Sequence, residues 1–361
     1  MDIASPTLRV HVVLDDDNGA WIIDKIAKRL VEHAPAFGID ATLSNKPRDD
    51  VDLNHWMSYA FANVAHATPT TMFITHLDDP YKVSLVRGEL SSGVAVGICM
   101  SSYAVEELVG RGIPRESLAY VLPAHDSSVT PRRIVIGLTT RLYPDGRKRE
   151  AMIVELARRM RLDAFRFDIY GQGWEKVVPR IVEAGAEVRY FDDTGDYVSN
   201  YRRIVEAIPS FDYYLYLGWD EGSLGTLDAL SAGVKTIVTP QGFHVDLPHG
   251  ITHAVRDIED LHAVFREIAE DRKARISSVS GLTWAEHTRE HAVIWRAVAA
   301  GRKAEIPSLL GRTAQPRFAP PPADIERQYR MRVLSPVRLR SALSHVPLLK
   351  PLRRWIVDRI R

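Results

Sequence analysis

Cysteine is nearly absent from this chain of 361 residues, with Cys99 as its only example. A single cysteine forms no internal disulfide and supplies no multi-cysteine zinc or iron–sulfur centre, and such scarcity is typical of a reducing cytoplasm. Long hydrophobic runs are missing too, because no window approaches about 18 consecutive apolar residues. The first residues lack the basic and apolar regions of a signal peptide. We therefore expect a cytoplasmic protein that is neither secreted nor membrane-spanning.

The net charge is only +1, since 47 Lys and Arg residues balance 46 Asp and Glu residues. This balance hides an asymmetry. Residues 327–361 hold ten basic residues and one acid, Asp358, so this segment carries +9 and residues 1–326 carry −8. An acidic body repels phosphates, which disfavours a general nucleic-acid binder. No nucleic-acid partner is therefore expected.

The composition, with 45% hydrophobic and 26% charged residues, is typical of a globular protein, and the length suggests two domains. Apolar strands alternate with amphipathic helical patterns, which predicts parallel sheets covered by helices on both faces. A proline- and serine-bearing stretch near 123–131 separates two such series. The expected fold class is thus α/β, with two Rossmann-like doubly wound domains facing across a cleft. The strands are predicted at 8–14, 71–75, 94–98, 117–122, 134–138, 165–170, 187–191, 213–217 and 235–239.

The most informative segment for function is 217–233, where a strand leads into an acidic loop and a short helix that Gly233 ends. Backbone amides at a helix start favour a diphosphate, and small residues leave them accessible. Asp228, about one turn later, could accept hydrogen bonds from ribose hydroxyls. The alternative is a helix start with ordinary acidic capping. The amides in question belong to Gly222, Ser223, Leu224 and Gly225.

This segment resembles the acidic-x7-acidic signature of GT-B glycosyltransferases, in particular the large retaining family four. The family normally has two glutamates, for which Asp220 and Asp228 would stand here, ahead of Ala-Leu-Ser-Ala-Gly. Glu221 is the first acid instead if the loop is one residue shorter, so the choice between Asp220 and Glu221 stays open. The resemblance extends over about residues 8–300. It ends with a helix from Trp284 to Trp295 that looks like the family's closing helix, which returns toward the first domain.

Further matches follow in the family's order. The loop after the strand at 134–138 is similar to the one that supplies an arginine and a lysine to the donor diphosphate, which implies Arg141 and Lys148, with Arg147 as a substitute. Two cations neutralise a leaving diphosphate as neutral residues cannot. A solvated basic turn is the alternative. Gly171 and Gly173 resemble the family's G-x-G beneath the nucleotide base.

In the first half, the strand at 71–75 is followed by His76, which resembles the histidine that contacts the donor sugar and phosphate. A strand-end histidine can also be a purely structural hydrogen-bonder. The first loop, 15–20, takes the place of the family's glycine-bearing loop and includes Asn18 and Gly19 among the expected donor contacts, although the usual glycine pair is missing. Likewise Ser223 and Leu224 replace the family's x-F-G.

The resemblance implies transfer of a sugar from a nucleotide diphosphate sugar to a hydroxyl of a glycan or lipid-linked acceptor, with retention, in surface glycan or lipopolysaccharide assembly. It implies no cofactor besides this donor. The implied domains are an acceptor domain at 1–124, a linker at 125–132, a donor domain at 133–300 and a proline-rich linker at 301–326. Two alternatives remain, a catalytically silent nucleotide-sugar-binding module and a nucleotide-sugar epimerase. The aspartates in place of glutamates motivate the silent module.

No metal site is expected. Three aspartates at 15–17 could resemble the metal site of GT-A enzymes, but they follow the first strand, which is too early for that fold. A second candidate set lies in a glycine- and proline-bearing loop with no fixed face, where ligand spacing alone is permissive. It comprises His244, Asp246, His249 and His253.

The tail at 327–361 interleaves apolar and basic residues, as do segments that lie on an anionic bilayer. Its prolines break it into two short amphipathic pieces. This pattern predicts peripheral association with the inner face of the plasma membrane, near a lipid-linked acceptor. Alternatively the tail docks on the acidic body of the same chain or of a partner subunit, which leaves a homo-oligomer open.

Overall fold

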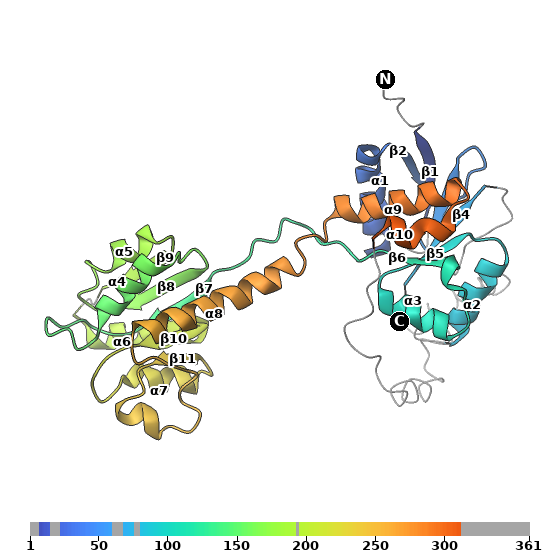
Figure 1. Cartoon of the computed structure of the whole chain (residues 1–361). Helices are drawn as coiled ribbons and strands as arrows, with labels where there is room; N and C mark the ends of the chain where they lie inside the picture. The colour runs from blue at the N-terminus through green and yellow to red at the C-terminus, as the bar shows by residue number, and fades with distance from the viewer. Residues whose placement is uncertain (1–6, 15–21, 60–67, 76–79, 193–194, 312–361) are drawn as a thin grey trace, which may run out of the picture. The chain divides into compact units, whose positions relative to one another are not determined.

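The computed structural model describes residues 7–14, 22–59, 68–75, 80–192 and 195–311. Within these ranges the chain forms two compact units, and it passes from one to the other after Ser127 and again after Ser280 (Figure 1). The first unit therefore combines the described residues up to 127 with those from 281 to 311. The second unit is the continuous stretch between them.

The first unit contains a six-stranded sheet in the order β2-β1-β3-β4-β5-β6 in which all neighbours are parallel. Its strands are β1 (Leu8–Val13), β2 (Ile39–Ser44), β3 (Leu53–Trp56), β4 (Thr70–Ile74), β5 (Val96–Cys99) and β6 (Leu118–Tyr120). Its helices are α1 (Ile22–His33), α2 (Pro80–Ser91), α3 (Ser102–Gly110), α9 (Trp284–Ala299) and α10 (Ile306–Leu309).

The second unit has the same plan, with the strand order β12-β11-β10-β7-β8-β9 and parallel neighbours throughout. Its strands are β7 (Ile134–Leu138), β8 (Phe165–Tyr170), β9 (Glu187–Phe191), β10 (Tyr213–Tyr216), β11 (Lys235–Val238) and β12 (His253–Ala254). Its helices are α4 (Glu150–Arg159), α5 (Val178–Glu183), α6 (Tyr197–Ala207), α7 (Leu224–Ser231) and α8 (Ile258–Ser277).

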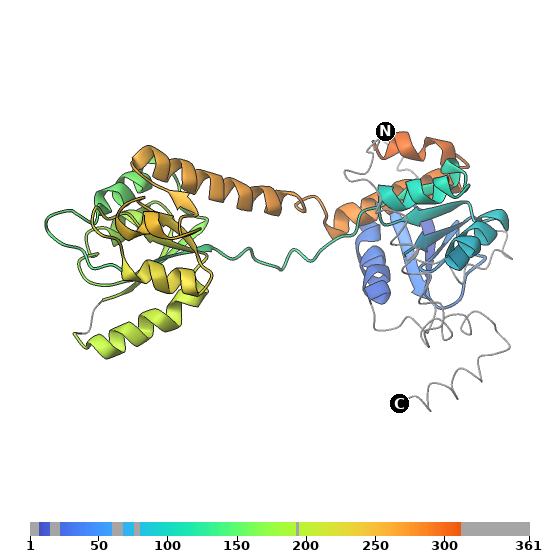
Figure 2. The ribbon, with the colours of Figure 1, turned by 90° about the horizontal axis from the view of Figure 1, so that it is seen from below.

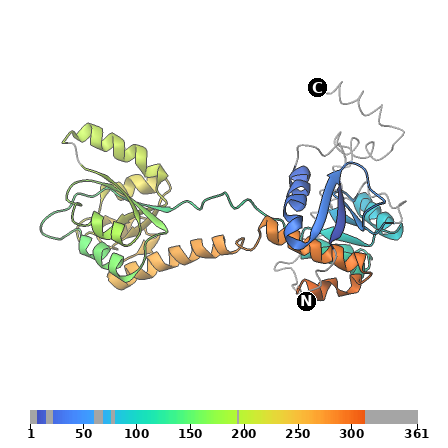
Figure 3. The same ribbon diagram turned by 90° about the horizontal axis from the view of Figure 1, so that it is seen from above.

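Helices cover both faces of each sheet, which Figures 2 and 3 show for either unit taken by itself. In the first unit, one apolar cluster contains α1 and α9 and a second contains α2 and α3. In the second unit, α4, α5 and α8 share one cluster, and Ala229 of α7, the end of α6 and the segment after it share another. Burial on both faces requires near-continuous apolar strands. The predicted class of two doubly wound α/β domains is confirmed.

Strands β2 and β3 are not predicted from the sequence, because half of their residues are polar. Strand β3 reads Leu-Asn-His-Trp, yet all four residues are buried. The Asn54 side chain exchanges hydrogen bonds of 2.8 and 3.0 Å with the backbone of Arg48, and Nδ1 of His55 lies 2.9 Å from the Thr71 hydroxyl. Polar groups are buried where partners satisfy them, and these partners come from other segments.

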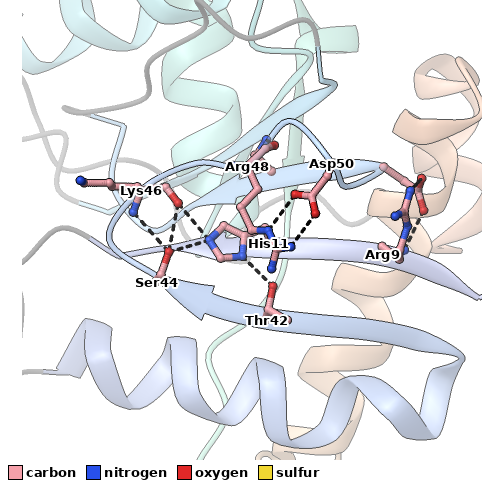
Figure 4. Close-up of polar contacts among 9 residues, drawn as sticks. Arg9, His11, Thr42, Ser44, Lys46, Arg48 and Asp50 are labelled. Carbon is pink, nitrogen blue, oxygen red and sulfur yellow. Dashed lines mark hydrogen bonds and ion pairs between the residues drawn. The ribbon is translucent and has the colours of Figure 1, made fainter.

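The segment after β2 is held by His11 in the middle of β1 (Figure 4). The His11 ring is buried, with Nδ1 2.6 Å from the Thr42 hydroxyl and Nε2 2.9 Å from the Ser44 hydroxyl and 3.0 Å from the carbonyl oxygen of Lys46. Burial lowers the pKa of His11. The ring is therefore neutral, donating from Nε2 and accepting at Nδ1, and it fixes the path of the chain toward β3.

The boundary drawn from the sequence at residue 300 is wrong. Helix α9 lies in the core of the first unit, where Ile294, Trp295 and Ala297 are buried against α1 and the sheet. The second unit ends at Ser280 instead. Part of the expected linker at 301–326 is instead helix α10, whose Ile306 is buried in the same core. An apolar stripe on a helix does not reveal which of two similar cores that helix joins. The tail at 327–361 lies outside the described residues.

Three histidines and a tryptophan form the centre of the packing between α9 and the first sheet. The ring centre of His291 lies 4.5 Å from that of His287, 5.5 Å from that of His55 and 5.6 Å from that of Trp295. Burial, followed by repulsion from the neighbouring histidines, lowers the pKa of His55 to about 3 and that of His291 well below its ordinary value. Both rings are therefore neutral in the folded unit.

We expect acid to destabilise the first unit through these rings. In the unfolded chain they titrate near pH 6.5, so unfolding takes up protons below that pH and the free energy of unfolding falls as the pH falls. Each histidine contributes up to about 1.4 kcal/mol per pH unit between its unfolded and folded pKa values. Urea unfolding between about pH 8 and pH 5 measures the slope. His291→Gln should flatten it, whereas His262→Gln, in the second unit, should not. Equal slopes in all three proteins would contradict the expectation.

Candidate active site

The strand order of the second unit changes direction between β7 and β10. From β7 the chain proceeds outward through β8 and β9, and then returns to β10 and continues through β11 and β12 on the other side. At such a point the loops after the two adjacent strands diverge and leave a crevice, which is where open α/β sheets bind ligands. Tyr214 of β10 lies opposite Gly137 of β7 in the sheet. The loops 139–149 and 217–223 therefore start side by side.

Lys148 and Asp220, one from each loop, form an ion pair at this edge. Nζ of Lys148 donates to Oδ2 of Asp220 at 2.6 Å and to the hydroxyl of Tyr216 at 2.7 Å. The Tyr216 hydroxyl in turn donates to Oδ1 of Asp220. The amide of Trp219 donates to the carbonyl oxygen of Arg147 at 2.8 Å, which ties the two loops together. A lysine that is only 14% exposed is thus held at a defined position.

The ionised form of Asp220 is stabilised by these contacts. Burial by itself raises the pKa of the carboxyl, but the hydrogen bonds from Lys148 and Tyr216 outweigh it, and the pKa lies below its ordinary value. Burial and the adjacent carboxylate raise the pKa of the Tyr216 phenol. The ammonium, the phenol and the carboxylate therefore form one network near neutral pH, in which Tyr216 positions the two charges.

Helix α7 begins beside this network, against the ends of β7 and β10. The Ser223 hydroxyl does not cap its own helix; it lies 2.8 Å from the Tyr214 hydroxyl, which is also 2.8 Å from Oγ1 of Thr139. A Cβ at Gly225 would lie 2.3 Å from Oγ1 of Thr139 and 2.4 Å from the Tyr214 hydroxyl. The first turn of α7 approaches the sheet this closely only because residue 225 is glycine.

His244 also contacts the first turn of α7. Its buried ring accepts at Nε2 from the amide of Ser223 at 3.3 Å, with the Thr226 hydroxyl 3.1 Å from the same atom, and Nδ1 lies 3.1 Å from the carbonyl oxygen of Thr239. The Gly222 amide donates to Oδ1 of Asp220 at 3.3 Å. Two of the four amides expected to bind a diphosphate, those of Gly222 and Ser223, thus have partners within the unit.

An aromatic cavity of about 270 Å³ lies next to this crevice, beyond the ends of β8 and β9. Its rings are those of Tyr170 and Phe191, stacked with centres 4.7 Å apart, and of Tyr197 and Tyr201, with centres 6.0 Å apart. Arg141 is exposed and lines this cavity. Flat aromatic walls with a cation are suited to a planar, electron-rich ring.

Gly171 borders the cavity with φ of +129°, and a Cβ there would lie 2.8 Å from the carbonyl oxygen of Thr140. Gly173 follows on the same loop, and Trp174 after it donates to that carbonyl oxygen at 2.6 Å. The G-x-G therefore allows the loop after β8 to pass close to the loop after β7.

The other residues selected from the sequence are distributed as follows. Glu221 has an exposed side chain, and its carbonyl oxygen accepts from the amide of Phe243 at 3.1 Å. Asp228 is partly exposed on the second turn of α7, and Leu224 is 73% exposed at its start. His76, Asn18 and Gly19 lie outside the described residues, as do the three aspartates at 15–17.

Several residues of this region are not found by sequence reasoning. Tyr214 and Tyr216 read as part of an apolar strand, and His244 reads as a candidate metal ligand. One signal exists in the sequence, because a buried phenol usually needs a hydrogen-bond partner and strand β10 holds three tyrosines. One partner of each of these two phenols, Thr139 for Tyr214 and Lys148 for Tyr216, comes from a loop that is distant in sequence. Across the described ranges, no group of three or more His, Cys, Asp or Glu side chains is placed to hold a metal ion.

Among the helices of the described residues, none is long and apolar enough to cross a membrane. No protein-family model matches the sequence, and no curated protein matches it.

Solved structures give weak likenesses. Anabaena HepE in complex with UDP and glucose is 12% identical, with 84% of this chain and 99% of that chain covered and a TM-score of 0.30. The lipopolysaccharide outer core galactosyltransferase WaaB in its apo form is 12% identical, covering 80% and 100%, with a TM-score of 0.32. The catalytic domain of a cholesterol-α-glucosyltransferase from Helicobacter pylori is 15% identical, covering 44% and 99%, with a TM-score of 0.31.

Proposed function

We propose that the protein is a GT-B glycosyltransferase that moves a sugar from a nucleotide diphosphate sugar to a hydroxyl acceptor, with retention. One observation carries the proposal. Lys148 and Asp220 are 72 positions apart, and each matches a separate motif of the resemblance; their side chains lie 2.6 Å apart at the switch point of the second sheet. A crevice with a fixed ammonium beside a helix start is suited to a diphosphate.

The chemistry follows from the charges at this edge. Leaving-group departure places negative charge on the diphosphate, and a positioned cation stabilises that charge more strongly than water does. Lys148 would share its protons between Asp220 and the diphosphate, while Arg141 would approach from the aromatic cavity. The uncommitted amides of Leu224 and Gly225 would contribute at the start of α7. Asp228 would hold the ribose, and the cavity rings would stack on the base.

Between the two candidate acids, we propose Asp220 as the first acid of the signature. It contacts Lys148, Tyr216 and the amide of Gly222, whereas the Glu221 side chain is exposed. His76 remains our proposal for the donor sugar, and a glycan or lipid-linked hydroxyl remains our proposal for the acceptor.

A screen of nucleotide sugars tests this function. The full-length protein is incubated with each donor, with and without a mixture of hydroxyl acceptors, and free nucleotide and sugar products are measured. Nucleotide release that requires an acceptor is the expected result. Interconversion of the sugar without release would indicate an epimerase instead. Saturable binding of a donor with neither reaction would indicate a silent binding module.

A further inference from the structure

A second cavity of the second unit lies at the amino ends of the strands, at the edge of the sheet opposite to the candidate active site. Its volume is about 610 Å³, within the range of small-molecule pockets. The floor is formed by the first residues of three neighbouring strands, and the wall by the last turns of α8. Those strand residues are Ile134 of β7, Tyr213 of β10 and Lys235 of β11. The proposed transferase function uses none of them.

Positive charge dominates this cavity, because five basic residues and two acids line it. Both acids are already paired. Two nitrogens of the Arg132 guanidinium donate to the two carboxylate oxygens of Asp212 at 2.6 and 2.8 Å, and Arg275 pairs with Asp271. The remaining basic residues are Arg133, Lys235 and Arg272.

Arg272 and Lys235 are positioned by uncharged groups. The Arg272 guanidinium donates to the carbonyl oxygens of Pro131 and Arg132 at 3.0 to 3.3 Å. The Lys235 ammonium lies 5.7 Å from the ring centre of Tyr213. Arg133, by contrast, is turned toward Glu187, at 4.0 Å. Carbonyls and an aromatic ring orient a cation without cancelling its charge, so Lys235 and Arg272 are prepared for an anion.

We propose that this cavity binds a phosphate-bearing anion, with Lys235 and Arg272 as its main contacts. A guanidinium and an ammonium are the side chains that bind phosphate oxygens most strongly. The volume leaves room for two linked phosphates or for one phosphate on a larger body. A soluble phosphate compound and a phospholipid headgroup share this chemistry. The basic tail of the chain has the wrong sign to occupy the cavity.

Calorimetric titration of the full-length protein with inorganic pyrophosphate tests the site. Lys235→Ala and Arg272→Gln should each raise the dissociation constant about tenfold, the effect of losing one charged hydrogen bond. Lys273→Ala removes the same charge from the adjacent position of α8, outside the cavity, and should change it less than about twofold. Lys148→Ala disables the proposed donor site and should leave this binding in place. A circular dichroism spectrum of Arg272→Gln checks its fold.

Two results with these variants would overturn the proposal. Equal weakening by Lys273→Ala and Lys235→Ala would show that pyrophosphate responds only to the general positive charge of this surface. Loss of all binding in Lys148→Ala would show that pyrophosphate binds only at the carboxyl edge. The outcome of the donor screen affects neither reading, so failure of the transferase function and failure of this site are distinguishable.

The source of the phosphate is decided with vesicles of phosphatidylcholine, with and without phosphatidic acid. The basic tail can also bind these vesicles, so binding through the cavity is defined as the co-sedimentation that Lys235→Ala abolishes and that pyrophosphate competes away. If such co-sedimentation is found, the ligand of the cavity is a lipid headgroup. If pyrophosphate binds but no such co-sedimentation is found, the ligand is a soluble phosphate compound. Binding to neither ligand overturns the proposal.

Discussion

Lys148→Ala is expected to lower kcat/KM by about 10²–10³, the usual effect of removing one preorganised group that stabilises an anionic transition state. The Lys148 side chain is 14% exposed and its ammonium is held by Asp220 and Tyr216, so little reorganisation is needed when a diphosphate binds. Steady-state rates with the donor that the screen identifies measure the effect. Lys176→Ala is a matched control, since this exposed lysine follows the G-x-G loop. Near-normal turnover of Lys148→Ala would contradict the assignment of Lys148 to the donor diphosphate.

Two variants, Asp220→Asn and Glu221→Gln, test which of these residues is the first acid of the signature. Asp220→Asn keeps the shape of the side chain but loses the charge that orients Lys148, and we expect kcat/KM to fall by about tenfold or more. Glu221→Gln makes the same chemical change at an exposed neighbour and should cost less than about twofold. Tyr216→Phe should lower kcat/KM less than Asp220→Asn does, because the contact of Lys148 with Asp220 remains. The reverse order of the two acid variants would assign the role to Glu221.

Trp295→Ala is expected to destabilise the first unit by about 3–5 kcal/mol, the cost of removing a large buried aromatic side chain and leaving a cavity. Trp295 is 0% exposed and packs against His55 and His291 at 5.4 and 5.6 Å between ring centres. Because these contacts join α9 to the sheet, α9 should lose protection in hydrogen exchange before the strands do.

The matched comparison is Trp219→Ala in the second unit. Trp219 is 60% exposed, so its removal should change the free energy of unfolding by no more than about 0.5 kcal/mol. Urea unfolding of both variants gives the measurement. A Trp295→Ala protein with the midpoint of the parent chain would show that α9 contributes little to the stability of the first unit.

The strands that are buried on both faces were determined by the sequence alone. The bounds of β7 follow from a continuous apolar run between turn residues, which local pattern is sufficient to define. Such runs separated the chain into two α/β series, and glycine spacing located the loops at Gly171 and Gly225. Motif resemblance further selected Lys148 and Asp220, whose contact the sequence could not show.

Only the tertiary structure decided which polar residues become buried and which core each helix joins. The polar residues Asn54 and His55 predict a loop, yet they lie in the buried strand β3. Their side chains are buried there because Arg48 and Thr71 supply hydrogen-bond partners. Helix α9 has an apolar stripe that would fit either sheet, and its histidines and Trp295 pack in the first. Tyr216 and His244 each have a partner from a more distant segment, Lys148 and Ser223 respectively. A hydrogen bond or a packing contact depends on two segments at once, whereas a local pattern describes one, and that is why these features were decided by the fold.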